Sequence, residues 1–301
     1  MNSIVKEYSM QKTADRAALI SSIEVARILG VNVATVKRWT DSGKLDCVKT
    51  AGGHRKFLLR HLAAFAMDHE KYSQRLSLLP LDTSGNLELS SEILNADMTK
   101  LIPRVLQAAI ASDQESLKTI LNGLYMVHQD LVGIYQDLLT PVLQQVGEMW
   151  MNRELSVTQE HLASQTIRDG IVKLQDIVVR PARSEGKAFV LTLSEELHDI
   201  PAKMVQHVME ARGYQVLFSG QKTPVADTSS VFNSFHPDRV YLSVVYTENV
   251  SKAQAEILEL QNLCEQYGAI LYAGGAGLDQ LSFSEEGAVI RLGSLREVHE
   301  S

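Results

Sequence analysis

Residues 188–201 read AFVLTLSEELHDIP, an apolar run followed by an acidic loop that contains one histidine. The run at 188–193 has the length and composition of a buried β-strand. Strands that alternate with helices are typical of a doubly wound parallel sheet, and the stretches that follow alternate in this way. The further apolar runs lie at 215–218, 239–245, 269–272 and 289–292. We therefore predict a flavodoxin-like, Rossmann-like α/β domain with a five-stranded parallel sheet over residues 183–301.

Polar residues and glycines follow these strands, at the sheet edge where doubly wound folds bind ligands. Glu196 and His198 come directly after the first strand. A carboxylate bonded to one ring nitrogen would hold the imidazole in the tautomer that binds a metal through the other nitrogen. Taken alone, His198 could equally be a polar loop residue. The other candidate ligand contacts at this edge are Thr223, Ser243, Val245, Gly274 and Gly275.

The composition describes an ordinary globular protein with room for two or three domains, since it has 301 residues, of which 45% are hydrophobic and 22% charged. Residues 19–65 hold eight Lys or Arg against three Asp or Glu, a local charge of +5 in a chain of net charge −7. The basic charge is therefore concentrated at one end of the chain. We expect a polyanionic partner there.

The two cysteines, Cys47 and Cys264, lie in different predicted domains and outside any Cys-x-x-Cys pair. We expect neither a disulfide nor a zinc site. The first residues have no apolar core of signal-peptide length, and no apolar stretch approaches the ~18 residues of a membrane span. We expect a cytoplasmic protein without membrane contact.

The basic segment has the cap and turn residues of a helix-turn-helix. Ser21 and Glu24 form a predicted capping box at the start of a first helix. Gly30 ends that helix, Asn32 caps a second one and Gly43 ends the second. Two short helices joined by a tight turn, with a basic second helix, are typical of DNA-binding helix-turn-helix domains.

A glycine-containing hairpin follows over residues 49–57 and is a predicted wing, while residues 1–18 are expected to form a loose arm. Trp39 is expected in the core of the module. The side chains expected to contact DNA are Thr35, Lys37, Arg38, His54, Arg55 and Lys56. The other interpretation is a basic surface on a small helical domain that binds protein.

The module at 19–70 resembles the MerR-type winged helix-turn-helix at Ile23, Ala26, Leu29-Gly30-Val31, Thr35-Val36, Trp39 and Gly52-Gly53-His54-Arg55. The resemblance implies double-stranded operator DNA as the partner. One such module makes few phosphate contacts, so useful affinity implies two or more copies on repeated half-sites.

The middle of the chain divides into a linker at residues 71–97, which lacks helical periodicity, and a helical segment at 98–182. Four or so helices with short connections predict an antiparallel bundle. The predicted helix boundaries are capping boxes at Ser112 with Glu115 and at Ser156 with Gln159, and helix ends at Gly123 and Asn152.

Trp150 falls at the end of one predicted helix, and Glu160 and His161 fall in the first turns of the next. This spacing can bring the three side chains to one end of the bundle. Taken singly, Trp150 is a candidate core anchor, and Glu160 with His161 is a candidate ion pair. Together with His198, they are what a protein would need to hold a flat metal macrocycle between two domains.

The bundle segment resembles the helical cap that covers cobalamin in methionine synthase and in the CarH and LitR family of transcription regulators. The matching residues are Pro141-Val142-Leu143, Val146-Gly147, Trp150, Ser156-Val157 and Glu160-His161-Leu162-Ala163-Ser164. The resemblance implies that Trp150 packs against the upper axial group of cobalamin and that Glu160 and His161 help to position this group.

The α/β domain resembles the cobalamin-binding fold, in which an acid-x-His-x-x-Gly signature supplies the lower axial ligand of cobalt. The resemblance places the acid at Glu196 and the metal ligand at His198, with Ser243 lining the slot for the nucleotide tail. Pro201 stands in place of the final glycine, and Glu195 is bulkier than the small residue expected before the acid.

The resemblance runs over nearly the whole chain from Ile20 and points to CarH/LitR-like, MerR-type cobalamin-dependent regulators. It implies a repressor and not an enzyme, a homodimer or homotetramer that holds DNA with adenosylcobalamin bound and releases it in light. Light-sensing relatives often carry a histidine directly after the cap tryptophan, where this chain has Met151, which leaves His161 as a candidate upper ligand. The alternatives are a cofactor-independent repressor with a degenerate cobalamin pocket and, in a different class, a corrinoid carrier.

Overall fold

The computed structural model describes residues 20–50, 52–57, 61, 62, 65, 69, 87–178, 180, 181, 183–281 and 289–301. The chain divides into two compact units, one comprising Met1–Asp130 with Asp137–Leu174 and the other Leu131–Gln136 with Gln175–Ser301. In the described part of the chain, no helix is both long and apolar enough to cross a membrane.

The amino-terminal module is a helix-turn-helix with a small antiparallel sheet. Its elements are β1 (Ile20–Ser21), α2 (Ser22–Leu29), α3 (Val33–Asp41), β2 (Val48–Lys49) and β3 (Arg55–Phe57), with strand order β1-β3-β2. The capping box is present, since Ser21 accepts from the N–H of Glu24 and the Glu24 carboxylate accepts from the N–H of Ser21. Gly30 ends α2 in the left-handed conformation, and Asn32 caps α3. The predicted helices, turn and hairpin are confirmed.

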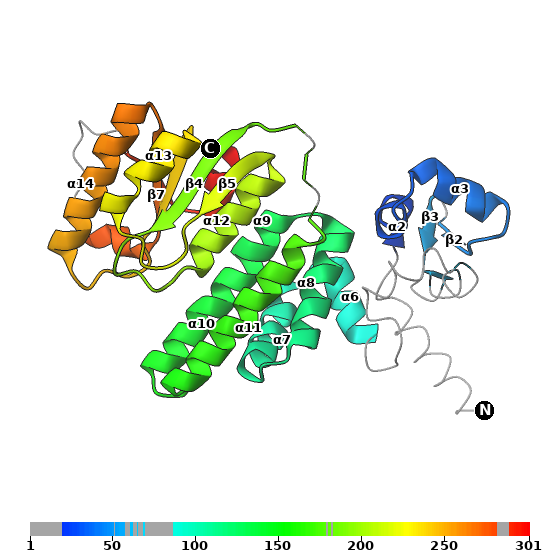
Figure 1. The fold of residues 1–301 in the computed structure, drawn as a ribbon. Helices are drawn as coiled ribbons and strands as arrows, with labels where there is room; N and C mark the ends of the chain where they lie inside the picture. Colours follow the sequence, from blue (N-terminus) through cyan, green and yellow to red (C-terminus); the bar gives the residue numbers. More distant parts are fainter. Residues whose placement is uncertain are drawn as a thin grey trace. The chain divides into compact units, whose positions relative to one another are not determined.

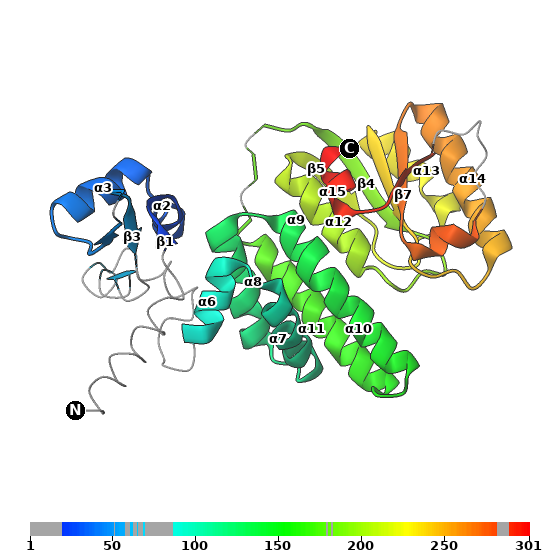
Figure 2. The same ribbon diagram turned by 180° about the vertical axis from the view of Figure 1, so that it is seen from behind.

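The central helices form a bundle of α6 (Leu87–Asn95), α7 (Met98–Ile110), α8 (Gln114–His128), α10 (Thr140–Met151) and α11 (Val157–Gln175). Both ribbon views show α7, α8, α10 and α11 side by side (Figures 1 and 2). Because Asn152 caps the end of α10 and α11 begins at Val157, the short connection makes these two helices antiparallel. The bundle, the end at Asn152 and the box at Ser156 with Gln159 are confirmed.

Three expectations for this region are wrong. Residues 87–95 of the predicted linker form helix α6, because Ser90 and Ile93 are fully buried; residues 71–86 lie outside the described part. Helix α8 runs through Gly123, where burial outweighs the cost of about 1 kcal/mol for glycine in a helix. The cap of α8 is Asp113, which accepts from the N–H of Ser116 at 3.0 Å, and not Ser112.

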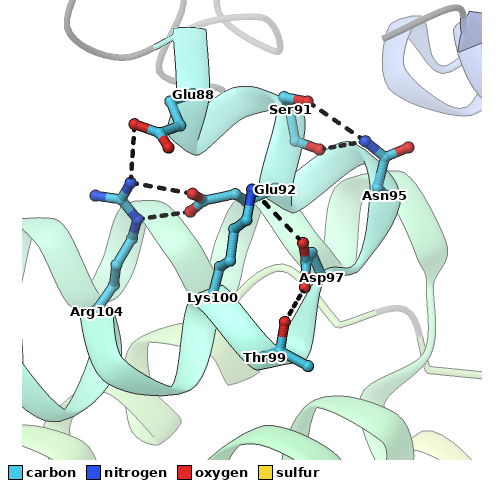
Figure 3. A network of polar contacts seen from close by, with 8 residues as sticks. All are labelled: Glu88, Ser91, Glu92, Asn95, Asp97, Thr99, Lys100 and Arg104. Atoms are coloured by element: carbon cyan, nitrogen blue, oxygen red, sulfur yellow. Dashed lines mark hydrogen bonds and ion pairs between the residues drawn. The ribbon is translucent and has the colours of Figure 1, made fainter. Parts of the chain in front are cut away.

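Helix α6 is held on α7 by a network of charged side chains (Figure 3). The guanidinium of Arg104 donates to both carboxylate oxygens of the buried Glu92, at 2.5 and 3.0 Å. The exposed carboxylate of Glu88 lies 3.6 Å from the same guanidinium. Hydrogen bonds from Arg104 therefore compensate for the burial of Glu92.

Between α8 and α10 the chain contributes a short segment to the second unit. This segment contains α9 (Leu131–Gly133) and the first residues of the π-helix η1 (Ile134–Leu139). The hydroxyl of Tyr135 lies 2.8 Å from Nδ1 of His207, and both side chains are fully buried. The next residue, Gln136, accepts from the N–H of Leu295 at 2.9 Å. Two adjacent side chains thus fasten residues 131–136 to the second unit.

The second unit is a doubly wound α/β domain, as predicted. Its strands are β4 (Gly186–Thr192), β5 (Tyr214–Phe218), β6 (Arg239–Ser243), β7 (Ile270–Gly274) and β8 (Val289–Leu292). They are all parallel in the order β5-β4-β6-β7-β8, so the order reverses between β4 and β6. Ligands bind at such a reversal, beyond the carboxyl ends of the strands.

The remaining elements cover the two faces of this sheet. They are α12 (Ile200–Ala211), η2 (Val225–Asp227), α13 (Ser229–Phe235), α14 (Val250–Tyr267), η3 (Ala276–Gln280) and α15 (Leu295–Glu300). Helices α12 and α15 pack together on one face, and α13 and α14 on the other (Figures 1 and 2). The core under α13 and α14 is apolar, with Leu191, Phe232, Val240, Ile257 and Leu260 among its buried members.

Candidate functional site

The loop between β4 and α12 is organised around the carboxylate of Glu196. This residue is only 2% exposed, although it is acidic. Its Oε1 accepts from the N–H of His198 at 2.8 Å and lies 2.7 Å from Nδ1 of the same residue. Its Oε2 accepts from the N–H groups of Val245 and Tyr246 at 2.7 and 2.9 Å. One carboxylate therefore joins the histidine loop to the loop that follows β6.

The electrostatics of this arrangement favour an ionised acid. Burial by itself would raise the pKa of Glu196, but the hydrogen bonds from the His198 ring and from three backbone N–H groups hold the pKa below its ordinary value. An ionised carboxylate only accepts hydrogen bonds, so Nδ1 of His198 carries a proton, and in the neutral imidazole Nε2 then carries the lone pair. The His198 side chain is 57% exposed. Its ring therefore has the tautomer and accessibility of a metal ligand.

The residues on either side of the histidine fit this loop. Pro201 lies in the first turn of α12, where a missing N–H costs nothing, so the replacement of glycine by proline is compatible with the helix start. The bulky Glu195 points its carboxylate to Lys252, at 2.9 Å. Gln221 donates to the carbonyl of Leu197 at 2.6 Å, which ties the loop after β5 to the histidine loop.

The structure places the other predicted contacts at the same sheet edge. Ser243 is the last residue of β6 and is buried in register with Thr192 and Gly274. The hydroxyl of Thr223 donates to Ser219 at 2.6 Å. Val245 is half-buried and contributes its backbone N–H to Glu196.

Gly275 has a role within the chain itself. Its φ is +112°, and a Cβ at this position would lie 2.1 Å from the carbonyl oxygen of Val244. The glycine therefore lets the turn after β7 pack directly against the backbone that follows β6. The sequence predicts that Gly275 contacts a ligand. The close approach of its backbone to that of Val244 already explains why glycine is needed at this position.

A cleft of about 770 Å³ opens at the carboxyl edge of the sheet. Its lining comes from the loops after β4, β5 and β6 and from the start of α14: Ser194, Glu195, Leu197, Lys222, Glu248, Asn249, Val250 and Ser251. Near it, the large apolar side chains of Leu197, Tyr246 and Val250 are exposed. The prediction missed Tyr246 and Gln221. The apolar run that ends at Tyr246 was the available signal for the first, whereas nothing in the sequence marks the second.

The predicted cap residues lie at the end of the bundle where α10 passes into α11. Trp150 is 47% exposed, which rules out its interpretation as a core anchor. The exposed Met151, Val157 and Leu162 belong to the same end. Glu160 accepts from the hydroxyl of Ser164 at 2.7 Å and lies 3.6 Å from Nε2 of His161. This end of the bundle therefore exposes four large apolar side chains among polar ones such as Arg153 and Glu154.

The candidate DNA contacts divide into exposed and engaged side chains. Lys37 and Arg38 on α3 and His54 on the hairpin turn are exposed, and Lys56 is half-buried. Thr35 uses its N–H and hydroxyl on the Asn32 cap, at 2.8 and 2.9 Å. Trp39 is half-buried and packs its ring 4.8 Å from that of Phe65, so its expected place in the core is only partly realised.

Arg55 differs from its neighbours in the predicted wing. Its guanidinium donates to the carboxylate of Asp41 at 2.5 Å, and its side chain is 22% exposed. The predicted contact between Arg55 and DNA phosphates would therefore compete with the ion pair that Arg55 forms with Asp41.

Comparisons with known protein families match two separate segments of the chain. The family of helix-turn-helix domains matches residues 19–69, and the family of B12 binding domains matches residues 101–175. These matches define a class, helix-turn-helix regulators that carry a B12 binding domain. Within this class the chain is CarH-like, because it is 25% identical to the HTH-type transcriptional repressor CarH of Myxococcus xanthus over 263 residues, 83% of this chain and 87% of CarH.

Two further proteins resemble part of the chain. A corrinoid protein of Desulfitobacterium hafniense (strain Y51) is 23% identical over 194 residues, which cover 62% of this chain and 89% of that protein. The monomethylamine corrinoid protein of Methanosarcina barkeri superposes with a TM-score of 0.52 at 13% identity, covering 67% of this chain and 96% of that structure. At this identity the superposition shows a shared fold.

Proposed function

We propose that this protein is a DNA-binding transcriptional repressor that depends on adenosylcobalamin, whose cobalt His198 would bind. The observation that carries this proposal is the double attachment of the Glu196 carboxylate. It orients the ring of His198 through Nδ1, and it also accepts hydrogen bonds from two backbone N–H groups of the loop after β6. A metal-binding histidine is commonly oriented by a carboxylate in this way.

One imidazole from the protein is enough for a corrin, because the corrin ring itself holds the cobalt. His198 would supply one imidazole, and the cleft at the sheet edge, with Leu197 and Val250 in its lining, would receive part of the ring. The exposed Trp150, with Glu160 and His161, supplies the further candidate contacts for the bound cofactor. The CarH-like domain content supports this assignment. Adenosylcobalamin, when bound, supplies a cobalt–carbon bond that light can break.

We propose that light is the signal and that it acts through assembly. In darkness, the protein with adenosylcobalamin bound would form a homodimer or homotetramer, whose several helix-turn-helix modules together hold operator DNA. Without the adenosyl group, this assembly would no longer be favoured. The assembly would then separate, and each single module would bind too weakly to stay on the operator.

The cofactor is tested by incubating the purified protein with adenosylcobalamin in darkness and then desalting it. We expect a coloured, stoichiometric complex in the wild type and at least a tenfold loss of retained cobalamin in His198→Ala. His54→Ala in the DNA-binding module is the matched histidine control and should retain cobalamin fully. Equal retention by His198→Ala and the wild type would exclude His198 as the axial ligand.

The control by light is tested on the same complex by gel filtration and DNA binding, before and after illumination. We expect a larger species that binds DNA in darkness and a smaller species with weaker binding after light. A colourless protein that binds DNA equally with and without cobalamin would identify a cofactor-independent repressor. A coloured protein that never binds DNA would identify a corrinoid carrier.

A further inference from the structure

The wing strand β3 presents its basic residues on two opposite faces. Side chains alternate along a strand, so Arg55 and Phe57 share one face of the sheet and Lys56 lies on the other. Phe57 is fully buried, which identifies its face as the one that packs on the module's core. Arg55 therefore projects from the core face of the wing.

On that face, Arg55 contacts the carboxyl end of α3, the second helix of the helix-turn-helix. Asp41 is the last residue of α3, and its carboxylate accepts from the Arg55 guanidinium at 2.5 Å. Only 22% of the Arg55 side chain is exposed, whereas Asp41 is 60% exposed. An acid at the carboxyl end of a helix is disfavoured by the helix dipole, so a cation at this place is favourable. The pair joins the wing to α3 and cancels one positive charge.

We propose that Asp41 withholds Arg55 from the DNA backbone, so that the wing binds phosphate through His54 and Lys56 while Arg55 sets the position of the wing on α3. This inference rests on the proposed DNA-binding function. It assigns a positioning role to Asp41, an acid in a module whose other candidate residues are basic or neutral. It also removes Arg55 from the set of phosphate contacts.

The number of cations that neutralise phosphates can be measured directly. The logarithm of the binding constant falls linearly with the logarithm of the salt concentration, and each phosphate contact contributes about 0.9 to the slope. A basic residue that never reaches a phosphate contributes nothing to this slope. A side chain with a purely structural role changes stability and leaves the slope as it is.

The experiment uses the full chain and a fluorescently labelled duplex of mixed sequence, with binding followed by anisotropy over a series of salt concentrations. Arg55→Gln should leave the slope unchanged. Lys56→Gln, its neighbour on the opposite face, should lower the magnitude of the slope by about 0.9 per module. Asp41→Asn should raise the slope by up to about 0.9 per module and tighten binding at low salt, because it frees Arg55. Thermal unfolding followed by circular dichroism identifies any variant that has lost its fold.

The proposal is overturned if Arg55→Gln, with its fold intact, lowers the slope as much as Lys56→Gln does. It is also overturned if Asp41→Asn leaves the slope of the wild type unchanged, and this variant decides the question if Arg55→Gln fails to fold. A wild-type protein that does not bind the duplex at low salt would instead refute the DNA-binding function itself.

Discussion

Tyr135 and His207 lie 72 residues apart in the chain and share a buried hydrogen bond of 2.8 Å between the phenol oxygen and Nδ1. In the described part of the chain, Nε2 of His207 is buried and has no hydrogen-bond partner. A buried imidazole in this setting cannot gain a proton without losing much of its favourable environment. The pair therefore makes the α/β unit sensitive to acid at a point away from the candidate cofactor loop.

The first prediction concerns this sensitivity. Burial, with the nearby cations Lys203 and Arg180, lowers the pKa of His207 from 6.5 to about 3. The unfolded chain therefore binds one more proton than the folded chain between these values, and the free energy of unfolding should fall as the pH is lowered from about 6.5 to about 3. His207→Gln, which does not titrate, should flatten this dependence. Urea denaturation at several pH values measures it, and an equally steep loss in the variant would contradict the prediction.

The second prediction separates Glu196 from its neighbour. Glu196→Gln has one acceptor oxygen where the carboxylate has two, so it must lose either the His198 ring or the N–H groups of Val245 and Tyr246. Cobalamin retention should fall by roughly 10- to 100-fold, the usual effect of removing the partner of a metal-binding histidine. Equilibrium dialysis with cobalamin in darkness measures this fall.

Glu115→Gln is the matched control for that experiment. It removes one carboxylate from α8, where the exposed Glu115 lies 3.8 Å from Nζ of Lys118 and outside the cleft at the sheet edge. Surface ion pairs contribute little, so retention should stay close to that of the wild type. Equal losses in both variants would show that retention responds to net charge and not to the orientation of His198.

The third prediction tests the close approach of backbones at Gly275. Gly275→Ala places a Cβ 2.1 Å from the carbonyl oxygen of Val244 at a φ of +112°, and it should destabilise the α/β unit by more than about 1 kcal/mol. Gly147→Ala, in the interior of α10 with no heavy atom within 4 Å of the new Cβ, should instead stabilise the bundle by about 0.5–1 kcal/mol. Thermal unfolding compares the two, and a neutral Gly275→Ala would refute the steric argument.

The fourth prediction concerns the attachment of α6. Arg104→Met leaves the buried carboxylate of Glu92 without its two hydrogen bonds and should cost about 1–3 kcal/mol. Glu88→Gln removes the exposed partner at 3.6 Å and should change stability by less than about 1 kcal/mol. Urea denaturation gives both values, and amide exchange over residues 87–95 shows whether α6 is the part released. Faster exchange in the Glu88 variant alone would reverse the assigned roles.

Much of the α/β domain could be predicted because its signals are local. Apolar runs of strand length marked all five strands within a few residues, and the acid two positions before His198 indicated the hydrogen bond that the structure contains. The backbone partners of Glu196 could not be predicted in this way. Any residue other than proline at Val245 or Tyr246 offers the same N–H, so the sequence carries no sign of the contact.

The features that could not be predicted depend on contacts between residues that lie far apart in the sequence. Helix α6 went unrecognised because its buried Glu92 and Ser90 are polar, and only Arg104 on another helix makes the burial of Glu92 favourable. Side-chain alternation along β3 places Arg55 on the same face as the buried Phe57, so the face on which Arg55 lies can be predicted. What could not be foreseen was that Asp41 would be within reach.

The two tryptophans of the chain lie in different domains, Trp39 in the helix-turn-helix beside Phe65 and Trp150 at the exposed end of α10. Indole is the dominant natural emitter of a protein, and a corrin is a strong absorber that quenches emitters close to it. In a Trp39→Phe variant, the fluorescence of Trp150 would therefore report cobalamin binding. In a Trp150→Phe variant, the fluorescence of Trp39 would report DNA binding. The protein thus holds two built-in optical probes, one for each of its proposed ligands.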